Sequence, residues 1–432
     1  MDAASGAGGC VFIGVVLKAG WDRTRAGVDS REAFAEFAPM NEPIISADGH
    51  VNEAPEMWAR IPEPFRSAAK TRVKRREDGY ITLTLMGSDI VVPPPAVEMD
   101  DELRAKEFRN DPTGGSDLAV RTQKQLLDGV HAEVVFPNTL LCIGNRPEVD
   151  LNLAVATAYN DWVHELFTPE PERYVAAAFV PVDDVALAVA EAERCIAKGF
   201  RTLMLPCSYP WRPYDRRDYT PLWSLVEASG VVLNFHVFTG NVFFGTDFAS
   251  VDGMSVEEFA MRRESARVIE DRMERLSTTV IGMAAGMGPI VHLTGGGVLE
   301  RHPRLKFVVT EAEAGWLAWT LHAMDAMQHR RRLGLNTLSM RASDYFRRQG
   351  AVTITDDPIA LNNLGITGTD CIMWGNDYPH DEGTYPSSQP HRDAIAAVTT
   401  PAQARAIFAG NAARIYGFDL DAIGAKIDSL AA

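Results

Sequence analysis

The sequence predicts an α/β fold, a (β/α)8 barrel of the TIM type with two long insertions after its first and fifth strands. Three observations predict it. Eight short apolar runs lack the alternation of solvent-facing strands, as parallel strands covered on both faces do. Helical patterns separate these runs, which is typical of a parallel sheet. The two longest connections both leave from carboxyl ends of strands, where barrel enzymes build their sites. A doubly wound open sheet is the alternative.

The predicted elements alternate along the chain from residue 44 onward. Segment 151–167 repeats apolar residues at helical spacing, and segment 184–198 ends at Gly199, a favoured residue at a helix end. Further helices are predicted at 221–229, 315–328 and 401–416. The predicted strands are 44–48, 132–136, 174–180, 201–205, 231–236, 305–310, 352–355 and 371–375.

The remaining segments interrupt or precede this pattern. The insertions are residues 49–130 and 237–304, and the second contains a helical pattern at 256–276. Residues 1–39 are rich in glycine and alanine without a sustained period, so we predict a flexible amino-terminal extension before a barrel domain at 40–432. Because Met40 directly precedes the first strand, a later native start is the alternative to such an extension.

Composition and charge restrict the partners. The 42 basic and 58 acidic residues give a formal net charge of −16, which argues against nucleic acid or an anionic membrane. Five scattered cysteines without a CxxC motif indicate a reducing compartment. No apolar run reaches the ~18 residues that cross a bilayer. We therefore expect a cytoplasmic protein that acts on a small-molecule substrate.

Polar side chains end three of the predicted strands. Asp48 and His50 close the first, on the same side because they are two residues apart. His236 ends the fifth strand and Asp377 follows the eighth. Taken singly, each has an ordinary explanation as a turn, core or helix-cap residue. In a closed barrel all four lie on one rim, and two histidines with two carboxylates suit Zn²⁺, Mn²⁺ or Fe²⁺.

These motifs identify the chain as a member of the amidohydrolase superfamily. It resembles the branch that includes aminocarboxymuconate-semialdehyde decarboxylase and resorcylate-type decarboxylases, over about residues 44–416. The resemblance implies a metal-dependent barrel, often oligomeric, and we expect a homodimer. It also implies Asp48, His50 and His236 as metal ligands, and Asp377 as a ligand or acid/base. The segments that carry it are Ile45–Val51, Asn234–His236, Gly295–Phe307 and Trp374–His380.

The chain departs from the pattern of this branch at three places. Asn52 stands where many members have the second histidine of an HxH motif, and Asp48 can supply the missing ligand. The fourth strand ends without the lysine that bridges two metals in binuclear members, so we expect one divalent ion. Zn²⁺ is the first choice, with Mn²⁺ or Fe²⁺ as alternatives. Glu311 occupies the place of the catalytic histidine of the decarboxylases, and it can accept a proton or bind a metal.

Other residues are candidates for smaller roles. His380 follows Asp377 closely enough to reach the same pocket. The loop after the fourth strand carries Tyr209, Trp211 and Arg212, which could clamp an aromatic or carboxylate substrate, or pack on one another at the surface.

Two reactions fit this predicted site. In hydrolysis, which we place first because of Glu311, a metal-activated water attacks a carbonyl and Asp377 transfers its proton, while Glu311 or His380 positions the substrate. In nonoxidative decarboxylation, the metal chelates an aromatic or unsaturated carboxylic acid and Asp377 protonates the carbon that loses CO₂. A non-catalytic barrel that binds a ligand or metal is a third possibility.

Overall fold

The computed structural model describes ten segments of the chain. They are residues 42–69, 72–75, 81–85, 88–92, 115–142, 149–208, 212–240, 280–330, 338–380 and 383–431. The predicted amino-terminal extension, the helical pattern at 256–276, Tyr209 and Trp211 lie outside them.

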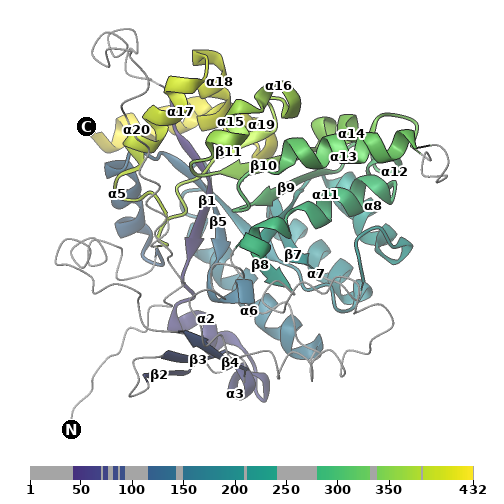
Figure 1. Ribbon diagram of the computed structural model, residues 1–432. Coiled ribbons are helices and arrows are strands. Elements are labelled where there is room, and N and C mark those ends of the chain that lie inside the picture. The colour runs from purple at the N-terminus through teal and green to yellow at the C-terminus, as the bar shows by residue number, and fades with distance from the viewer. Residues whose placement is uncertain are drawn as a thin grey trace.

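Eight parallel strands form the centre of the molecule in the order β1-β5-β6-β7-β8-β9-β10-β11, with helices around them (Figure 1). Each predicted strand is confirmed within a few residues. Every strand is buried along nearly all of its length, which explains the continuous apolar runs. The strands are β1 Ile45–Val51, β5 Ala132–Pro137, β6 Tyr174–Phe179, β7 Thr202–Ser208, β8 Val232–Gly240, β9 Lys306–Thr310, β10 Gly350–Ile354 and β11 Ile372–Trp374.

The sheet closes on itself between its first and last strands. Gly49 pairs with Tyr378 in a parallel bridge just beyond β11. The His50 N–H donates to the Tyr378 carbonyl at 2.6 Å, and the Asp377 N–H donates to the Asp48 carbonyl at 3.0 Å. This closure confirms the barrel and excludes the open sheet.

Helices follow the strands as βα units require. The predicted helix at 184–198 has Asp184 as its amino-terminal cap and Gly199 in the left-handed conformation at its end, with φ of 100°. The predicted helix at 401–416 contains one wider π-type turn at Ala406–Gly410. Longer helices are α5 Leu118–Leu127, α6 Val149–Phe167, α7 Val185–Lys198, α8 Thr220–Ser229, α11 Met287–Gly295, α13 Leu317–His329, α14 Ala342–Gln349, α17 Ser388–Val398 and α20 Leu420–Ala431. Shorter ones are α12 Val298–Arg301, α15 Pro358–Asn362, α16 Leu364–Thr367, α18 Pro401–Arg405 and α19 Asn411–Tyr416.

The insertion after β1 has structure of its own. Two short helices, α2 Pro55–Arg60 and α3 Phe65–Ala69, precede a three-stranded antiparallel sheet (Figure 1). Its strands are β2 Arg72–Arg75, β3 Ile81–Leu85 and β4 Ser88–Val92. The buried carboxylate of Glu53 accepts hydrogen bonds from the backbone N–H groups of Asn138, Thr139 and Leu140. It therefore joins the start of the insertion to the end of β5.

Within the described segments, no helix combines the length and apolar character that crossing a lipid bilayer requires.

Candidate metal centre

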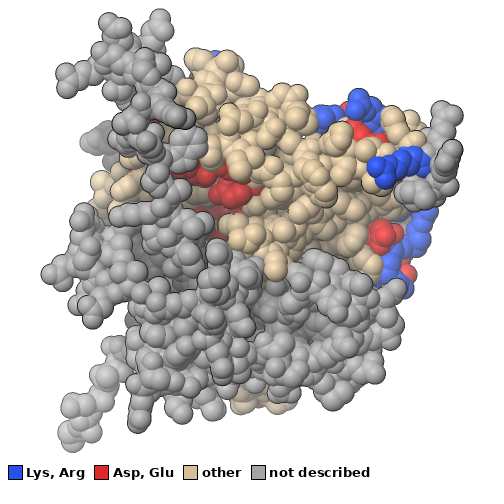
Figure 2. Space-filling model, in the orientation of Figure 1, with Lys and Arg blue, Asp and Glu red and all other residues tan. Residues whose placement is uncertain are grey.

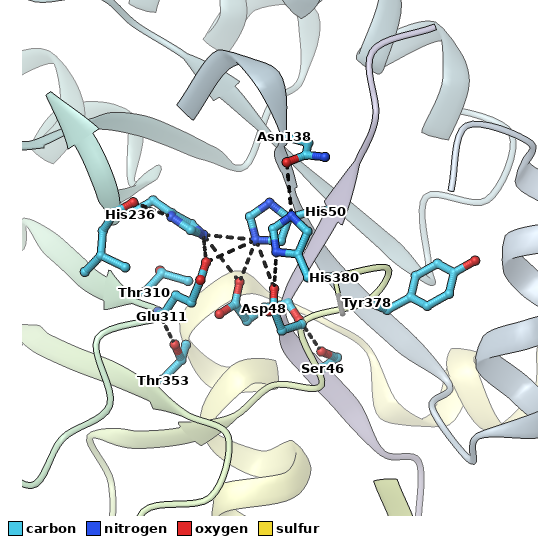
Figure 3. A network of polar contacts seen from close by, with 12 residues as sticks. Ser46, Asp48, His50, Asn138, His236, Thr310, Glu311, Thr353, Tyr378 and His380 are labelled. Carbon is cyan, nitrogen blue, oxygen red and sulfur yellow. Dashed lines mark hydrogen bonds and ion pairs between the residues drawn. The ribbon is translucent and has the colours of Figure 1, made fainter. Parts of the chain in front are cut away.

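Side chains from several strands converge at the carboxyl end of the barrel (Figure 3). Asp48 and His50 lie on β1 and His236 lies on β8. Glu311 directly follows β9. One ligand atom from each of these four residues lies within 4.8 Å of all the others, although the residues are far apart in the chain.

Two imidazole rings point the same nitrogen at this centre. His50 Nδ1 lies 2.9 Å from the Pro137 carbonyl, and His236 Nδ1 lies 2.9 Å from the Val237 carbonyl. A carbonyl only accepts, so Nδ1 carries the proton in each neutral ring and Nε2 presents a lone pair. The two Nε2 atoms are 3.2 Å apart. Facing lone pairs at that distance repel each other, and a cation bound by both nitrogens removes this repulsion.

Carboxylate oxygens complete the group. Asp48 Oδ1 lies 3.6 Å from the Nε2 atom of each histidine, and Glu311 Oε2 lies 3.4 Å from His50 Nε2 and 3.2 Å from His236 Nε2. Asp48 Oδ1 is buried and, among the described residues, meets no hydrogen-bond donor. Such an orphaned charge is costly. Two imidazole nitrogens and two carboxylate oxygens therefore fit a divalent ion such as Zn²⁺, Mn²⁺ or Fe²⁺.

Asp377 and His380 also lie against the His50 ring. Asp377 Oδ1 is 3.3 Å from His50 Nε2 and 2.9 Å from His380 Nδ1. The His380 ring stacks on His50 with centroids 4.0 Å apart, and its Nε2 lies 3.0 Å from Asn138 Oδ1. His50, Glu311, Asp377 and His380 form a second group that could hold an ion. Of the four ligands expected from the sequence, three lie in the first group, which Glu311 completes. The fourth, Asp377, lies in the second group, which also contains Glu311.

Burial sets the protonation of these groups. Burial, together with the field of His380, lowers the pKa of His50 to about 3, so the ring is neutral at neutral pH. Burial raises the pKa of Asp48. Burial would also raise the pKa of Asp377, but the charge of His380 and a hydrogen bond from His380 outweigh it and hold that pKa well below its usual range. The site thus has neutral His50 beside an anionic Asp377.

The backbone at the rim is strained. Phe238, Glu311, Glu313 and Asp377 have φ between 49° and 62°, and they are the non-glycine residues with positive φ in the described segments. Side chains other than glycine rarely adopt this conformation, which costs on the order of 1–3 kcal/mol per residue. All four follow or end strands at the carboxyl end of the barrel. This clustering is typical of a functional site.

Neighbouring groups hold Glu311 in its strained conformation. The Glu311 N–H donates to Thr353 Oγ1 on β10 at 2.8 Å. Asp357 Oδ2 accepts the N–H groups of Ala314 at 2.7 Å and Gly315 at 2.6 Å, so the loop after β9 is fastened to the loop after β10. No local pattern predicts these contacts, because they join residues about forty positions apart.

Gly375 makes room for Asp48. A Cβ atom at position 375 would lie 2.4 Å from the Asp48 Cβ and 3.0 Å from its backbone nitrogen. Only glycine allows the end of β11 to approach β1 this closely. A glycine directly before Asn376 and Asp377 was the signal available in the sequence.

One hollow of the described surface is acidic. Figure 2 shows acidic side chains gathered in a hollow beside the position of β10, whereas the described basic side chains lie mainly at the right-hand edge of this face. A hollow of this charge attracts cations.

Arg212 is half-buried, and its backbone carbonyl accepts the Tyr219 hydroxyl at 2.8 Å. Neither metal-binding group includes Arg212.

Comparisons with known proteins agree with this architecture. The sequence model of a family described as Amidohydrolase matches residues 146–418. A search of curated protein sequences finds no match. One similar solved structure is an amidohydrolase from Mycobacterium avium subsp. paratuberculosis, with a TM-score of 0.64 and 16% identity over 88% of this chain and 100% of the other.

Two further similar structures contain manganese. A 5-carboxyvanillate decarboxylase from Novosphingobium aromaticivorans has a TM-score of 0.60 and 14% identity over 88% of this chain and 99% of the other. A dihydroxybenzoic acid decarboxylase from a Polaromonas species has a TM-score of 0.54 and 16% identity over 87% of this chain and 97% of the other. At these identities the likeness shows a shared fold across nearly the whole chain.

Proposed function

Because the chain belongs to the amidohydrolase family, we propose that it is a metal-dependent carboxy-lyase, which removes CO₂ from an aromatic or unsaturated carboxylic acid. The observation that carries the proposal is the pair of facing Nε2 atoms of His50 and His236 with carboxylates around them. Solved decarboxylases with bound manganese share the fold, which favours this reaction over the hydrolysis that the sequence placed first.

In this proposal Asp48, His50, His236 and Glu311 hold one divalent ion. The ion would supply Lewis-acid chemistry, drawing electron density from the carboxylate and a neighbouring oxygen of the substrate. His50 is neutral at neutral pH, so it can serve as a ligand without first losing a proton. Mn²⁺ and Zn²⁺ both suit these donors. Elemental analysis of protein purified without chelator is expected to find about one equivalent of one of them.

In this proposal Asp377 and His380 hold the proton and transfer it to the substrate. His380 Nδ1 faces Asp377 Oδ1 at 2.9 Å, so a proton can rest between them. In the reaction the pair delivers that proton to the carbon bearing the carboxylate. The bond from this carbon to the carboxylate then breaks, its electrons restore the unsaturated system, and CO₂ leaves. Solvent returns the proton to the pair, so a carboxylate and one proton give the product and CO₂.

The test is to incubate the Mn²⁺-loaded enzyme with a panel of hydroxylated aromatic acids in D₂O. We expect CO₂ release with one deuterium at the vacated carbon, and loss of at least 100-fold in rate in Asp377→Asn, as for removal of a general acid. Asp393→Asn, an exposed aspartate on α17, is the control and should keep full activity. If the Mn²⁺-loaded enzyme converted none of the acids in the panel, the proposal would be contradicted.

Hydrolysis is the second candidate, and Glu311 favours it. Its carboxylate lies within 3.4 Å of both ligating nitrogens, where a base could take a proton from an attacking water. An ester, amide and lactone panel in H₂¹⁸O separates the reactions. Label appearing in a carboxylate product identifies hydrolysis, whereas CO₂ release from the panel of acids with no label in the organic product identifies decarboxylation.

A further inference from the structure

Arg121 is a fully buried arginine beside the metal centre. It lies on α5, in the last part of the insertion after β1, shortly before β5. Its Nη1 donates to the His50 carbonyl at 2.6 Å. Its Nε and Nη2 donate to both carboxylate oxygens of Glu133 on β5, at 2.9 and 2.8 Å. The guanidinium therefore joins α5, β1 and β5 at one point.

This point lies next to the seam between β1 and β11 where the barrel closes. The pairing of β1 with β5 shifts register between Ser46 and Gly49, directly before His50, which pairs with Phe136. The guanidinium also lies 5.1 Å from the ring centroid of Tyr378, the residue that follows Asp377. Arg121 thus contacts the backbone of one proposed ligand and the neighbour of another candidate.

Two glycines leave the space that the guanidinium fills. A Cβ at Gly115, which has φ of +77°, would lie 2.4 Å from Arg121 Nη1. A Cβ at Gly49 would lie 3.2 Å from Arg121 Nη2 and 2.9 Å from Glu133 Oε1. The chain therefore passes on two sides of the guanidinium with no room for another side chain.

The burial of an arginine–glutamate pair is weak evidence that the pair stabilises the folded protein. Removing both charges from water costs several kcal/mol per ion, and apolar replacements of such pairs are often neutral or stabilising. What the guanidinium contributes instead is a fixed arrangement of hydrogen-bond donors. Its planar fork holds Glu133 with two donors and the His50 carbonyl with a third, which the ammonium of lysine cannot reproduce.

We propose that Arg121 is a positioning residue for the metal centre, because it fixes the backbone of His50 against Glu133 and so sets where the His50 ring lies. This inference rests on the proposed metal site. Contacts that orient metal ligands typically change metal affinity by about 10- to 100-fold when they are lost.

Arg121→Lys tests this proposal, with Arg173→Lys as the matched control. Arg173 is also buried, and it also donates to a backbone carbonyl, of His131, and to a carboxylate, of Glu170. It precedes β6 at the opposite end of the barrel. Mn²⁺ affinity is measured by competition with a chelator, and folding by circular dichroism and thermal unfolding without metal.

We expect Arg121→Lys to bind Mn²⁺ about 10- to 100-fold more weakly and to change the visible spectrum of bound Co²⁺, which reports ligand geometry. Arg173→Lys should lower the unfolding temperature and leave the affinity unchanged. Folded Arg121→Lys with wild-type affinity and spectrum would overturn the proposal.

Glu133→Gln decides the question if Arg121→Lys does not fold. It removes the charge that holds the guanidinium but keeps the side-chain shape, and we expect at least a threefold loss of Mn²⁺ affinity. Unchanged affinity in this variant would overturn the role of Arg121. Failure of the metal site itself gives a different result, because the wild type would then bind no Mn²⁺.

Discussion

The ring of His50 has both of its nitrogens committed to one orientation. Nδ1 faces the Pro137 carbonyl at 2.9 Å, and Nε2 faces His236 Nε2 at 3.2 Å. Its backbone N–H and carbonyl are also bound, by Tyr378 and Arg121. A ligand held in this way loses little further freedom when an ion arrives, which favours tight binding.

We predict that Asp48→Asn binds Mn²⁺ at least 10-fold more weakly than the wild type. The amide keeps the shape of the side chain but removes the charge that balances the ion. Isothermal titration measures the affinity. Asp161→Asn, which changes a half-exposed aspartate on α6, should bind as the wild type does. Equal affinities for Asp48→Asn and wild type would exclude Asp48 as a ligand.

His131 gives a second prediction at this scale, remote from the site. Its Nδ1 accepts the Ile44 N–H at 2.8 Å, which only the neutral ring can do. Burial, with the charges of Arg173 and Arg392, lowers its pKa to about 4. The unfolded chain binds this proton first, so the stability it contributes is complete above about pH 6.5 and is lost as pH falls toward 4.

The measurement is urea unfolding of metal-free protein from pH 7 to pH 4.5, in the wild type and in His131→Asn. We expect the wild type to lose on the order of 1–3 kcal/mol more than the variant over this range, because the variant has no ring to protonate. Parallel pH dependences in the two proteins would contradict this assignment.

At the scale of elements, the approach of β11 to β1 depends on Gly375. Gly375→Ala places a methyl group 2.4 Å from the Asp48 Cβ, and we predict a loss of about 1–3 kcal/mol in stability with weaker Mn²⁺ binding. Gly365→Ala on α16 is the control, because nothing lies within 4 Å of its added Cβ. It should be neutral or stabilising by up to ~1 kcal/mol. Thermal unfolding and metal titration compare the two.

The loop that carries Glu311 depends on Asp357. Asp357→Ala removes the acceptor for the Ala314 and Gly315 N–H groups, so we predict both lower stability and at least threefold weaker Mn²⁺ binding. Asp184→Ala removes an ordinary helix cap of α7 and should cost about 1 kcal/mol without changing the affinity. If the two variants bind Mn²⁺ equally well, the loop does not control Glu311.

The strands of the barrel could be predicted from the sequence more fully than the contacts between side chains. The eight strands followed from the sequence because burial on both faces requires continuous apolar runs. No strand was predicted in the insertion 49–130, so the small sheet β2–β4 was missed. Asp48, His50 and His236 were expected together because strand ends of a barrel meet at one rim. The left-handed backbone of Glu311 and the roles of Asp357 and Arg121 depend on tertiary partners, which no local pattern encodes.

At the scale of the whole molecule, the proposed ion joins β1 to β8 and to the residue that follows β9. We predict that Mn²⁺ at 100 times its Kd stabilises the folded protein by about 2.7 kcal/mol relative to chelated protein. Differential scanning fluorimetry should show this as a rise of several degrees in Tm. Mg²⁺ prefers all-oxygen sites and should give a smaller shift. Equal Tm values with Mn²⁺ and with chelator would argue against a resident ion.

The closure of the barrel also determines when the metal site can form during synthesis of the chain. Ser46, beside Asp48, bonds to Asn376, which lies 330 positions further along the chain and precedes Asp377. A nascent chain on the ribosome therefore exposes His50 long before β11, the neighbour of β1 in the closed barrel, exists. An ion captured early would meet only part of its ligands, so tight loading must wait at least until Glu311, after β9, has emerged.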